Sequence, residues 1–162
     1  MKVIVLNCGS SSIKYQFFNT EEKEALAKGM VERIGMSSAI LTHARMDSDK
    51  IKIVGEILDH TIAIEYVIAV LLSPNHGVIK DKKEIDAVGH RVVHGGEEFS
   101  ESVLITDTVM RVLRDNIELA PLHNPPNIKG IEAAKAHLPA TPQVAVFDTA
   151  FHAKMPPHAY LY

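Results

Sequence analysis

The chain has 162 residues, of which 46% are hydrophobic and 23% charged, a balance that is normal for one globular domain with a substantial core. The net charge is −3 without a basic cluster, and no apolar run reaches the roughly 20 residues of a membrane span, so we expect neither a nucleic-acid nor a membrane partner. The single cysteine, Cys8, excludes an intramolecular disulfide, and no signal peptide is apparent, which favours a reducing, cytoplasmic location.

The first stretch predicts two strands joined by a polar turn. Residues 2–6 and 13–18 are apolar runs rich in β-type residues, and the segment 7–12 between them holds one glycine and three serines. Such a turn offers N–H groups and hydroxyls to phosphate oxygens, and Lys14 adds a positive charge. Asn7 can hold a metal-bound water at the strand end. An ordinary serine-rich turn is the alternative, and the Walker A pattern is absent.

The next elements are read from hydrophobic periodicity. A polar stretch over residues 20–28 predicts a solvated turn or edge. Asp59 is the expected N-cap of a helix that runs to about Leu72. Four further strands are predicted, over residues 29–34, 39–45, 51–57 and 85–93.

The last third predicts two helices and a strand. Thr106 is the expected cap of a helix over residues 107–116. Asn124 before Pro125 predicts the N-cap of a helix that ends near His137. A buried strand over residues 144–147 follows. This order of elements predicts an α/β fold with a mixed sheet.

Three polar clusters follow predicted buried strands: residues 7–12, 90–96 and 148–152. Ligand sites of α/β sheets gather at the carboxyl ends of strands, so the three clusters together indicate one site. In the second cluster, strand alternation places Arg91 and Val93 on one face and His90 on the other.

An arginine on an apolar strand is costly to bury unless it meets an anion, and a carboxylate or phosphoryl ligand supplies one. A structural ion pair is the alternative for Arg91. His90 and His94 are spaced as possible metal ligands, but no further ligand shows matching spacing. Asp148 ends an apolar strand, where it can hold Mg²⁺ through water, act as a general base or cap the next turn.

Other chemistry is possible at His123, at Cys8 and at the serines. His123 precedes a helix N-terminus, a natural anion site, and can equally be a plain loop histidine. Cys8 can be a nucleophile or a small residue in a tight place. A Ser/His/Asp hydrolase is disfavoured because the chain has no G-x-S-x-G elbow.

Four motifs, NCGSSSIKY, VGHRVVHGGEEF, LAPLHNPPN and VFDTAFHAKMP, resemble in order and separation those of the acetate kinase family. The resemblance covers essentially the whole chain. It implies a ribonuclease H-like domain of the acetate and sugar kinase/Hsc70/actin superfamily, with a mixed β-sheet flanked by helices. It also implies reversible, Mg²⁺-dependent transfer of the γ-phosphoryl group of ATP to acetate, giving ADP and acetyl phosphate, with Mn²⁺ as an alternative metal.

The resemblance assigns roles to matching positions. It implies that Asn7 and Asp148 bind the metal, and that the phosphates are bound by Ser10, Ser12, Lys14 and His123. It implies that Arg91 binds the acyl substrate and the phosphoryl group. It also implies that Val93 and Leu122 form an apolar wall around the acetate methyl. The family description makes Asp148 a catalytic proton donor or acceptor. A carboxylate nucleophile is already ionised at pH 7, so we expect Asp148 to organise Mg²⁺ instead.

The resemblance also bears on length. Full-length members are more than twice as long, so we expect this chain to be the N-terminal domain, over residues 1–162, without the nucleotide-binding C-terminal domain, and to be inactive alone. Family members are homodimers. A propionate or butyrate kinase is an alternative, but Val93 favours a small pocket, because in the family a smaller residue at this position goes with longer acyl chains. A non-catalytic binding module is another.

Overall fold

The computed structural model describes residues 1–93, 95, 99, 101–122 and 124–147. Three helices and eight strands are present there, with two short 3₁₀ helices at Lys82–Glu84 and Ile117–Leu119. The helices are α1 (His60–Leu72), α2 (Asp107–Asp115) and α3 (Asn124–His137). The strands are β1 (Lys2–Cys8), β2 (Ile13–Asn19), β3 (Glu24–Glu32), β4 (Ala39–Arg45), β5 (Ile51–Gly55), β6 (Ala87–Val92), β7 (Val103–Leu104) and β8 (Gln143–Phe147).

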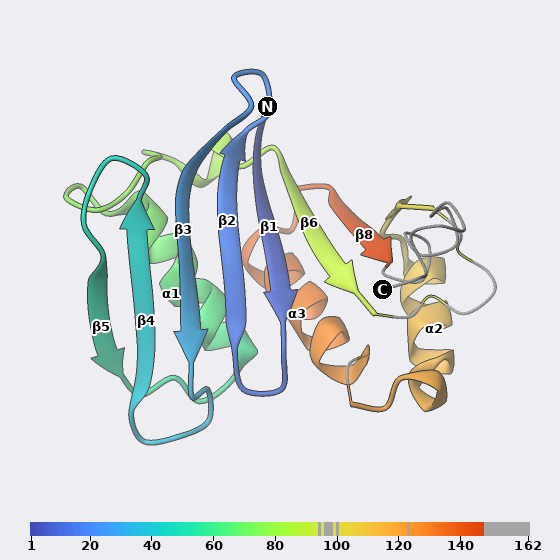
Figure 1. Ribbon diagram of the computed structural model, residues 1–162. Helices are drawn as coiled ribbons and strands as arrows, with labels where there is room; N and C mark the ends of the chain where they lie inside the picture. Colours follow the sequence, from blue (N-terminus) through green and yellow to red (C-terminus); the bar gives the residue numbers. More distant parts are fainter. Residues whose placement is uncertain (94, 96–98, 100, 123, 148–162) are drawn as a thin grey trace, which may run out of the picture.

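The strands of the described part form a single mixed sheet in the order β5-β4-β3-β2-β1-β6-β8-β7 (Figure 1). Strands β1, β6 and β8 are parallel neighbours, and the other pairs are antiparallel. The carboxyl ends of β1, β6 and β8 therefore meet at one edge of the sheet. The predicted α/β fold with a mixed sheet flanked by helices is confirmed.

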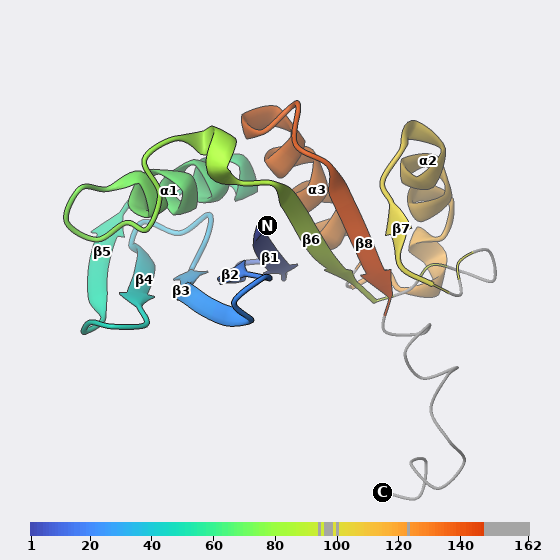
Figure 2. The ribbon, with the colours of Figure 1, turned by 90° about the horizontal axis from the view of Figure 1, so that it is seen from above.

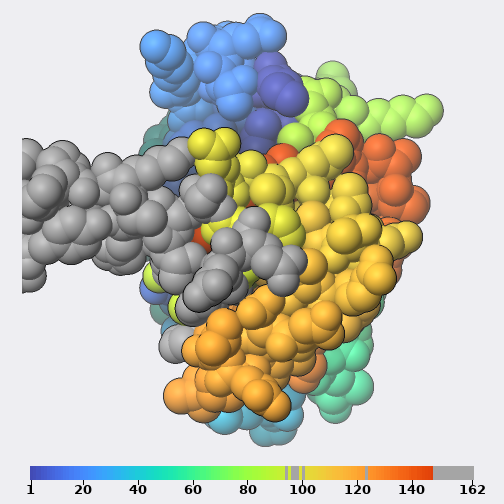
Figure 3. Space-filling view, turned by 90° about the vertical axis from the view of Figure 1, so that its right-hand side faces the viewer, coloured from blue at the N-terminus to red at the C-terminus, as the bar shows by residue number. Residues whose placement is uncertain are grey.

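The three helices pack on one face of this sheet (Figure 2). Helix α1 and the end of α3 cover β1–β4 with aliphatic side chains, whereas α2 packs with α3 against β6 and β8. Seen from the α2 side, the segments around α2 form most of the visible edge (Figure 3). The opposite face of the sheet carries no described helix, so the side chains of alternate strand residues are exposed there.

Local signals place the helix starts. The Asp59 side chain accepts a hydrogen bond from Ile62 N–H at 2.9 Å, and Thr106 caps α2 through Val109 N–H at 3.3 Å, as predicted. Helix α3 begins at Asn124, one residue before the expected start, because Asn124 N–H already donates to Ala120 O at 3.0 Å. Each cap fixes the residue at which its helix begins.

The third strand differs from the prediction of residues 29–34. Strand β3 covers Glu24–Glu32 and pairs with β2 from Glu24 to Val31, with one register shift. Left-handed residues mark both limits, Lys23 with φ 55° and Arg33 with φ 62°. Of the charged residues that suggested a solvated turn, Glu21–Lys23 do lie in a turn, whereas Glu24 and Lys28 belong to β3 and are exposed. Strand β7 was missed because two residues carry no periodicity.

Candidate functional site

The candidate site is built around the hairpin between β1 and β2. The hydrogen-bonded strands extend through Asn7 and Cys8, two residues further than predicted, so the turn itself is Gly9–Ser12. Gly9 N–H donates to Ser12 O at 2.8 Å and closes the turn. Ser10 is exposed and Ser12 is half-buried. The hydroxyls and amides of this short segment therefore lie at the edge of the sheet.

Groups from three other segments hold the carbonyls of this turn. His60 Nε2–H donates to Gly9 O at 2.7 Å from the start of α1. Asn127 Nδ2–H donates to Cys8 O at 2.9 Å from α3. Ile34 N–H donates to Ser11 O at 2.9 Å from the residue after the left-handed Arg33. The turn is thus fixed from the helix side and from the end of β3.

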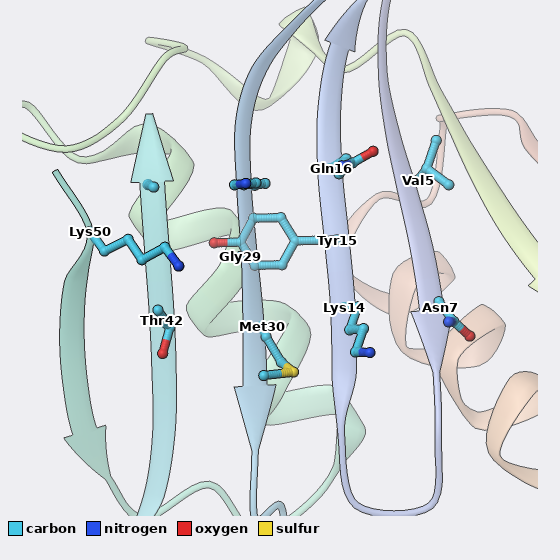
Figure 4. A pocket seen from close by; sticks show the side chains of 11 residues that line it. Val5, Asn7, Lys14, Tyr15, Gln16, Gly29, Met30, Thr42 and Lys50 are labelled. Carbon is cyan, nitrogen blue, oxygen red and sulfur yellow. The ribbon is translucent and has the colours of Figure 1, made fainter. Parts of the chain in front are cut away.

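Three of the predicted site residues lie in one row on the open face of the sheet. Asn7 pairs with Lys14 across the hairpin. Arg91 follows His90, whose Cα partner is Leu6, so Arg91 continues the row on the next parallel strand. Figure 4 shows Asn7 and Lys14 at the same level of neighbouring strands. Two cations and a side-chain amide are therefore adjacent to the serine turn, an arrangement suited to an anion.

The same face is hollowed over β1–β4. The hollow has a volume of about 460 Å³, and its end nearest the turn is lined by one row of residues across β1–β4, namely Asn7, Lys14, Met30 and Thr42 (Figure 4). Behind the hollow, Tyr15 O–H donates to His43 Nδ1 at 2.6 Å, while His43 Nε2–H donates to His76 O at 2.8 Å. Burial raises the pKa of Tyr15 and lowers that of His43, so both remain neutral near pH 7.

The reasoning from the cost of burying Arg91 was wrong in its premise. Alternation along β6 holds, but Arg91 lies on the exposed side, whereas His90 and Val92 are buried on the helix side. An exposed guanidinium needs no anion for folding. Its place beside Asn7, rather than burial, is what connects Arg91 with a ligand site.

His90 is a core residue of the described structure. Its side chain is 2% exposed, and Nε2–H donates to Gln143 Oε1 at 2.6 Å. Desolvation lowers the pKa of His90 to about 4, so the ring is neutral at pH 7. No group of three or more His, Cys, Asp or Glu side chains comes together among the described residues to hold a metal ion. His94, the other histidine of that alternative, lies outside them.

The nucleophile interpretation of Cys8 is not supported. Its side chain is buried at the end of β1, and desolvation raises the pKa of the thiol to about 12. A Cβ on Gly130 of α3 would overlap the Cys8 sulfur, so the thiol fills a close helix–strand contact. In the described structure, no histidine hydrogen bonds to a serine of the turn, so a Ser/His/Asp arrangement is not formed there either.

The structure describes only some of the remaining predicted site residues. Val93 is half-buried after β6, and its N–H donates to Asn127 Oδ1 at 3.2 Å. Leu122 is 78% exposed, two residues before α3, so its place in an acyl pocket stays a prediction. His123 and Asp148 lie outside the described residues, and so do their predicted roles.

Asn127 is the site residue that sequence reasoning missed. It belongs to the motif LAPLHNPPN, but only the fold brings it under both Cys8 and Val93. The signal available in the sequence was an asparagine inside a helix, a residue type that helices disfavour unless its side chain has a partner.

No described helix is long and apolar enough to cross a membrane.

The site therefore combines cations, a side-chain amide and a serine turn at the ends of parallel strands in a mixed α/β sheet. The family comparison is specific: a model described as the Acetokinase family matches residues 2–162. The chain belongs to the acetokinase family. The motif-based assignment is thereby confirmed.

Curated relatives agree with this. An acetate kinase of Desulfitobacterium hafniense (strain Y51) is 60% identical over 162 residues, which are 100% of this chain and 41% of that protein. An acetate kinase of Natranaerobius thermophilus is 58% identical over the same share of both. The chain thus spans about 41% of the length of these curated relatives.

Solved structures agree as well. The crystal structure of Porphyromonas gingivalis acetate kinase matches with a TM-score of 0.91 at 48% identity, covering 97% of this chain and 39% of that one. A propionate kinase from Francisella tularensis matches with a TM-score of 0.85 at 39% identity, over the same shares. These matches confirm that the fold is that of acetate kinases.

Proposed function

We propose that this chain supplies the acyl-substrate and phosphate half of an acetate kinase. The observation that carries the proposal is the row of Asn7, Lys14 and Arg91 beside the serine turn, on one face of the sheet. Both substrates of the reaction are anions, and the phosphoryl group in transfer carries further negative charge. A cluster of two cations and several N–H donors is the chemistry that such ligands require.

The reaction is a displacement at phosphorus. A carboxylate oxygen of acetate forms a bond to the γ-phosphorus of ATP, the bond from that phosphorus to the β–γ bridging oxygen breaks, and ADP leaves with the electron pair. Acetate is already ionised at pH 7, so no base has to remove a proton. The protein therefore contributes positioning and charge neutralisation.

This chain's residues divide those two tasks. Arg91 holds the acetate carboxylate and neutralises the phosphoryl oxygens, and its planar fork suits both anions. The phosphates are bound by Lys14, Ser10, Ser12 and His123. Val93 and Leu122 contact the acetate methyl. In reverse, the same groups bind acetyl phosphate and ADP.

A divalent cation completes the charge balance on the phosphates. Asn7 presents a side-chain amide on the open face, half-buried and beside Lys14, and amide oxygen is a donor that Mg²⁺ accepts directly or through water. Asn7 and Asp148 would hold Mg²⁺ there, and Mn²⁺ is the alternative with the same oxygen preference.

The remaining parts of the proposal concern the whole enzyme. We place the adenosine site and the nucleotide-binding domain in the part of the relatives that this chain does not match, with this chain as the N-terminal domain. The assembled enzyme is a cytoplasmic homodimer in this proposal. This chain alone then binds anions but does not turn over.

A complementation experiment tests the function. Acetyl phosphate formed from Mg-ATP and acetate is trapped as the hydroxamate for three samples: the chain alone, the chain mixed with the unmatched part of the Desulfitobacterium relative, and a chimera in which the chain replaces the matched segment. We expect activity in the chimera and none in the chain alone. A folded but inactive chimera would overturn the assignment, whereas activity of the chain alone would place the nucleotide site in these 162 residues.

A propionate kinase is the second candidate, favoured by the match to the Francisella structure. Val93 decides between them, because Asn127 holds its backbone N–H and the family resemblance assigns its side chain to the wall around the acyl group. One methylene is worth about 1–3 kcal/mol of discrimination. We expect the chimera to prefer acetate over propionate, and Val93→Ala to reduce that preference about tenfold. A chimera that prefers propionate would make the second candidate correct.

A further inference from the structure

We propose that His60 and Asn127 are positioning residues for a phosphate ligand: His60 orients the backbone amide of Ser10 in the Gly9–Ser12 turn, and Asn127 joins this turn to the end of β6. The proposal rests on the proposed function and adds two residues to the site that do not touch the substrate. His60 is the first residue of α1 and Asn127 lies in the first turns of α3. Both side chains are almost fully buried, 6% and 5% exposed.

The geometry of the peptide bond carries the first step. In a trans peptide, the carbonyl and the N–H of the next residue point in opposite directions, and the described chain contains no cis peptide. His60 Nε2–H holds Gly9 O at 2.7 Å, so the N–H of Ser10 points away from His60 and α1. In the same way, Ile34 N–H holds Ser11 O and turns Ser12 N–H away from Ile34.

The second step is that the Ser10 amide is available. Gly9 N–H is used within the turn by Ser12 O, but among the described residues nothing accepts a hydrogen bond from Ser10 N–H. Ser10 is exposed at the end of the hairpin that carries Asn7 and Lys14. An oriented, unpaired amide beside a lysine is a donor for a phosphate oxygen.

Asn127 fixes the distance between the Gly9–Ser12 turn and the end of β6. Its Nδ2–H donates to Cys8 O at 2.9 Å, and its Oδ1 accepts from Val93 N–H at 3.2 Å. A carbonyl can only accept and an N–H can only donate, so the amide has one possible orientation. One buried side chain thereby joins the turn to the end of β6, which carries Arg91.

The experiment uses the 162-residue chain and inorganic phosphate as the probe, followed through backbone amide NMR shifts. We expect Ser10 N–H to shift on titration with phosphate. His60→Leu, which removes the donor, should weaken that binding about tenfold or more, because a hydrogen bond to an anion loses its orientation. His60→Gln keeps an N–H donor near the position of Nε2 and should bind within about threefold of the unaltered chain.

A matched control lies on the same pair of helices. His137 of α3 donates through Nε2–H to Thr61 O at 2.9 Å, and its side chain is half-buried. His137→Leu removes a similar histidine–carbonyl bond without touching the turn, so phosphate binding should not change. For Asn127, Asn127→Asp keeps the acceptor for Val93 but loses the donor to Cys8 O, and it should weaken binding as His60→Leu does.

Three results would overturn the proposal: no phosphate-dependent shift of Ser10 N–H in the unaltered chain, normal phosphate binding by folded His60→Leu, or equal losses in His60→Leu and His60→Gln. The kinase assignment is decided separately by acetyl phosphate formation in the unaltered chimera. In an active chimera, His60→Leu should raise the KM for ATP and lower kcat, and His60→Gln should restore both. Loss in both variants would indicate a role in packing alone.

Discussion

The two ends of strand β1 are held in place by different chemistry. At the turn end, neutral and buried side chains, His60 and Asn127, donate hydrogen bonds to backbone carbonyls. At the opposite end, the contacts are charged and partly or fully exposed. Lys2 Nζ lies 2.8 Å from Glu84 Oε1, and the N-terminal ammonium lies 3.2 Å from Glu21 Oε1.

The difference indicates how a fold can leave charge for a ligand. Bonds that fix the turn use groups without formal charge, so they bring no carboxylate to Lys14 on the other face. At the far end no ligand is expected, and acids and bases pair with each other. If this interpretation is right, changes at the turn end alter activity and changes at the far end alter only stability.

The largest effect is expected for Arg91→Ala in the chimera. Loss of a guanidinium that stabilises phosphoryl transfer reduces kcat by about a thousandfold or more. Because Arg91 is exposed, its removal should change the free energy of unfolding by only about 0.5 kcal/mol. Hydroxamate formation and urea unfolding measure the two effects.

Arg114→Ala is the matched control for Arg91→Ala. Arg114 of α2 pairs with Glu132 at 2.6 Å, about half exposed and remote from the turn, so activity should not change. Activity of Arg91→Ala within tenfold of the unaltered chimera would remove Arg91 from the reaction.

The next largest effect is expected for the pH dependence of stability caused by His90. It tests whether uncharged buried groups stabilise the end of the sheet that carries the turn. Its pKa is about 4 in the folded chain, below the ordinary value of 6.5, so the unfolded chain binds the proton first as the pH falls. The stabilisation is complete above about pH 6.5 and is lost progressively down to pH 4, by up to about 3 kcal/mol. His90→Gln should remove this part of the pH dependence while keeping a donor for Gln143.

The measurement for His90 is the unfolding free energy at several values between pH 4 and 7. The difference between the unaltered chain and His90→Gln should shrink as the pH falls through this window. Parallel profiles for the unaltered chain and His90→Gln would show that His90 titrates normally.

Gly130→Ala tests the contact between α3 and the turn end of β1. The added methyl would overlap the Cys8 sulfur, and overpacking of this kind costs about 1–3 kcal/mol, partly offset by the better helix propensity of alanine. Cys8→Ala in the same chain should recover part of the loss. Gly89→Ala is the control, because its Cβ would lie 3.7 Å from Val5, an ordinary contact. Additive losses in the double variant would mean that the two residues do not meet.

Local features could be predicted from the sequence. The hairpin followed from two β-type runs around a serine turn, and the starts of α1 and α2 followed from Asp59 and Thr106, because a cap acts within three residues of itself. Asn7, Lys14 and Arg91 were chosen from strand ends and motifs, and the sheet register placed them in one row.

What could not be predicted depends on contacts between distant segments. His60 reaches a residue 51 positions away and Asn127 one 119 positions away, and no local pattern marks either pair. Strand β3 was placed too late because its charged residues face the open side of the sheet. The burial argument for Arg91 failed for the same reason: alternation predicts which residues share a face, but not which face is covered.

The smallest effect is expected at the far end of β1, for Glu84→Gln. A hydrogen bond from Lys2 Nζ, with further bonds from the N–H groups of Lys80 and Asp81, lowers the pKa of Glu84 to about 2. This contribution is present above about pH 4.5 and is lost as the pH falls toward 2. The pair is partly exposed and screened, so Glu84→Gln should shift the urea midpoint at pH 7 less than Gly130→Ala does. The gap in urea midpoint between Glu84→Gln and the unaltered chain should close between pH 4.5 and 2. Activity of the chimera should be unchanged, and a loss of activity in Glu84→Gln with an unaltered midpoint would show that charge at this end does reach the site.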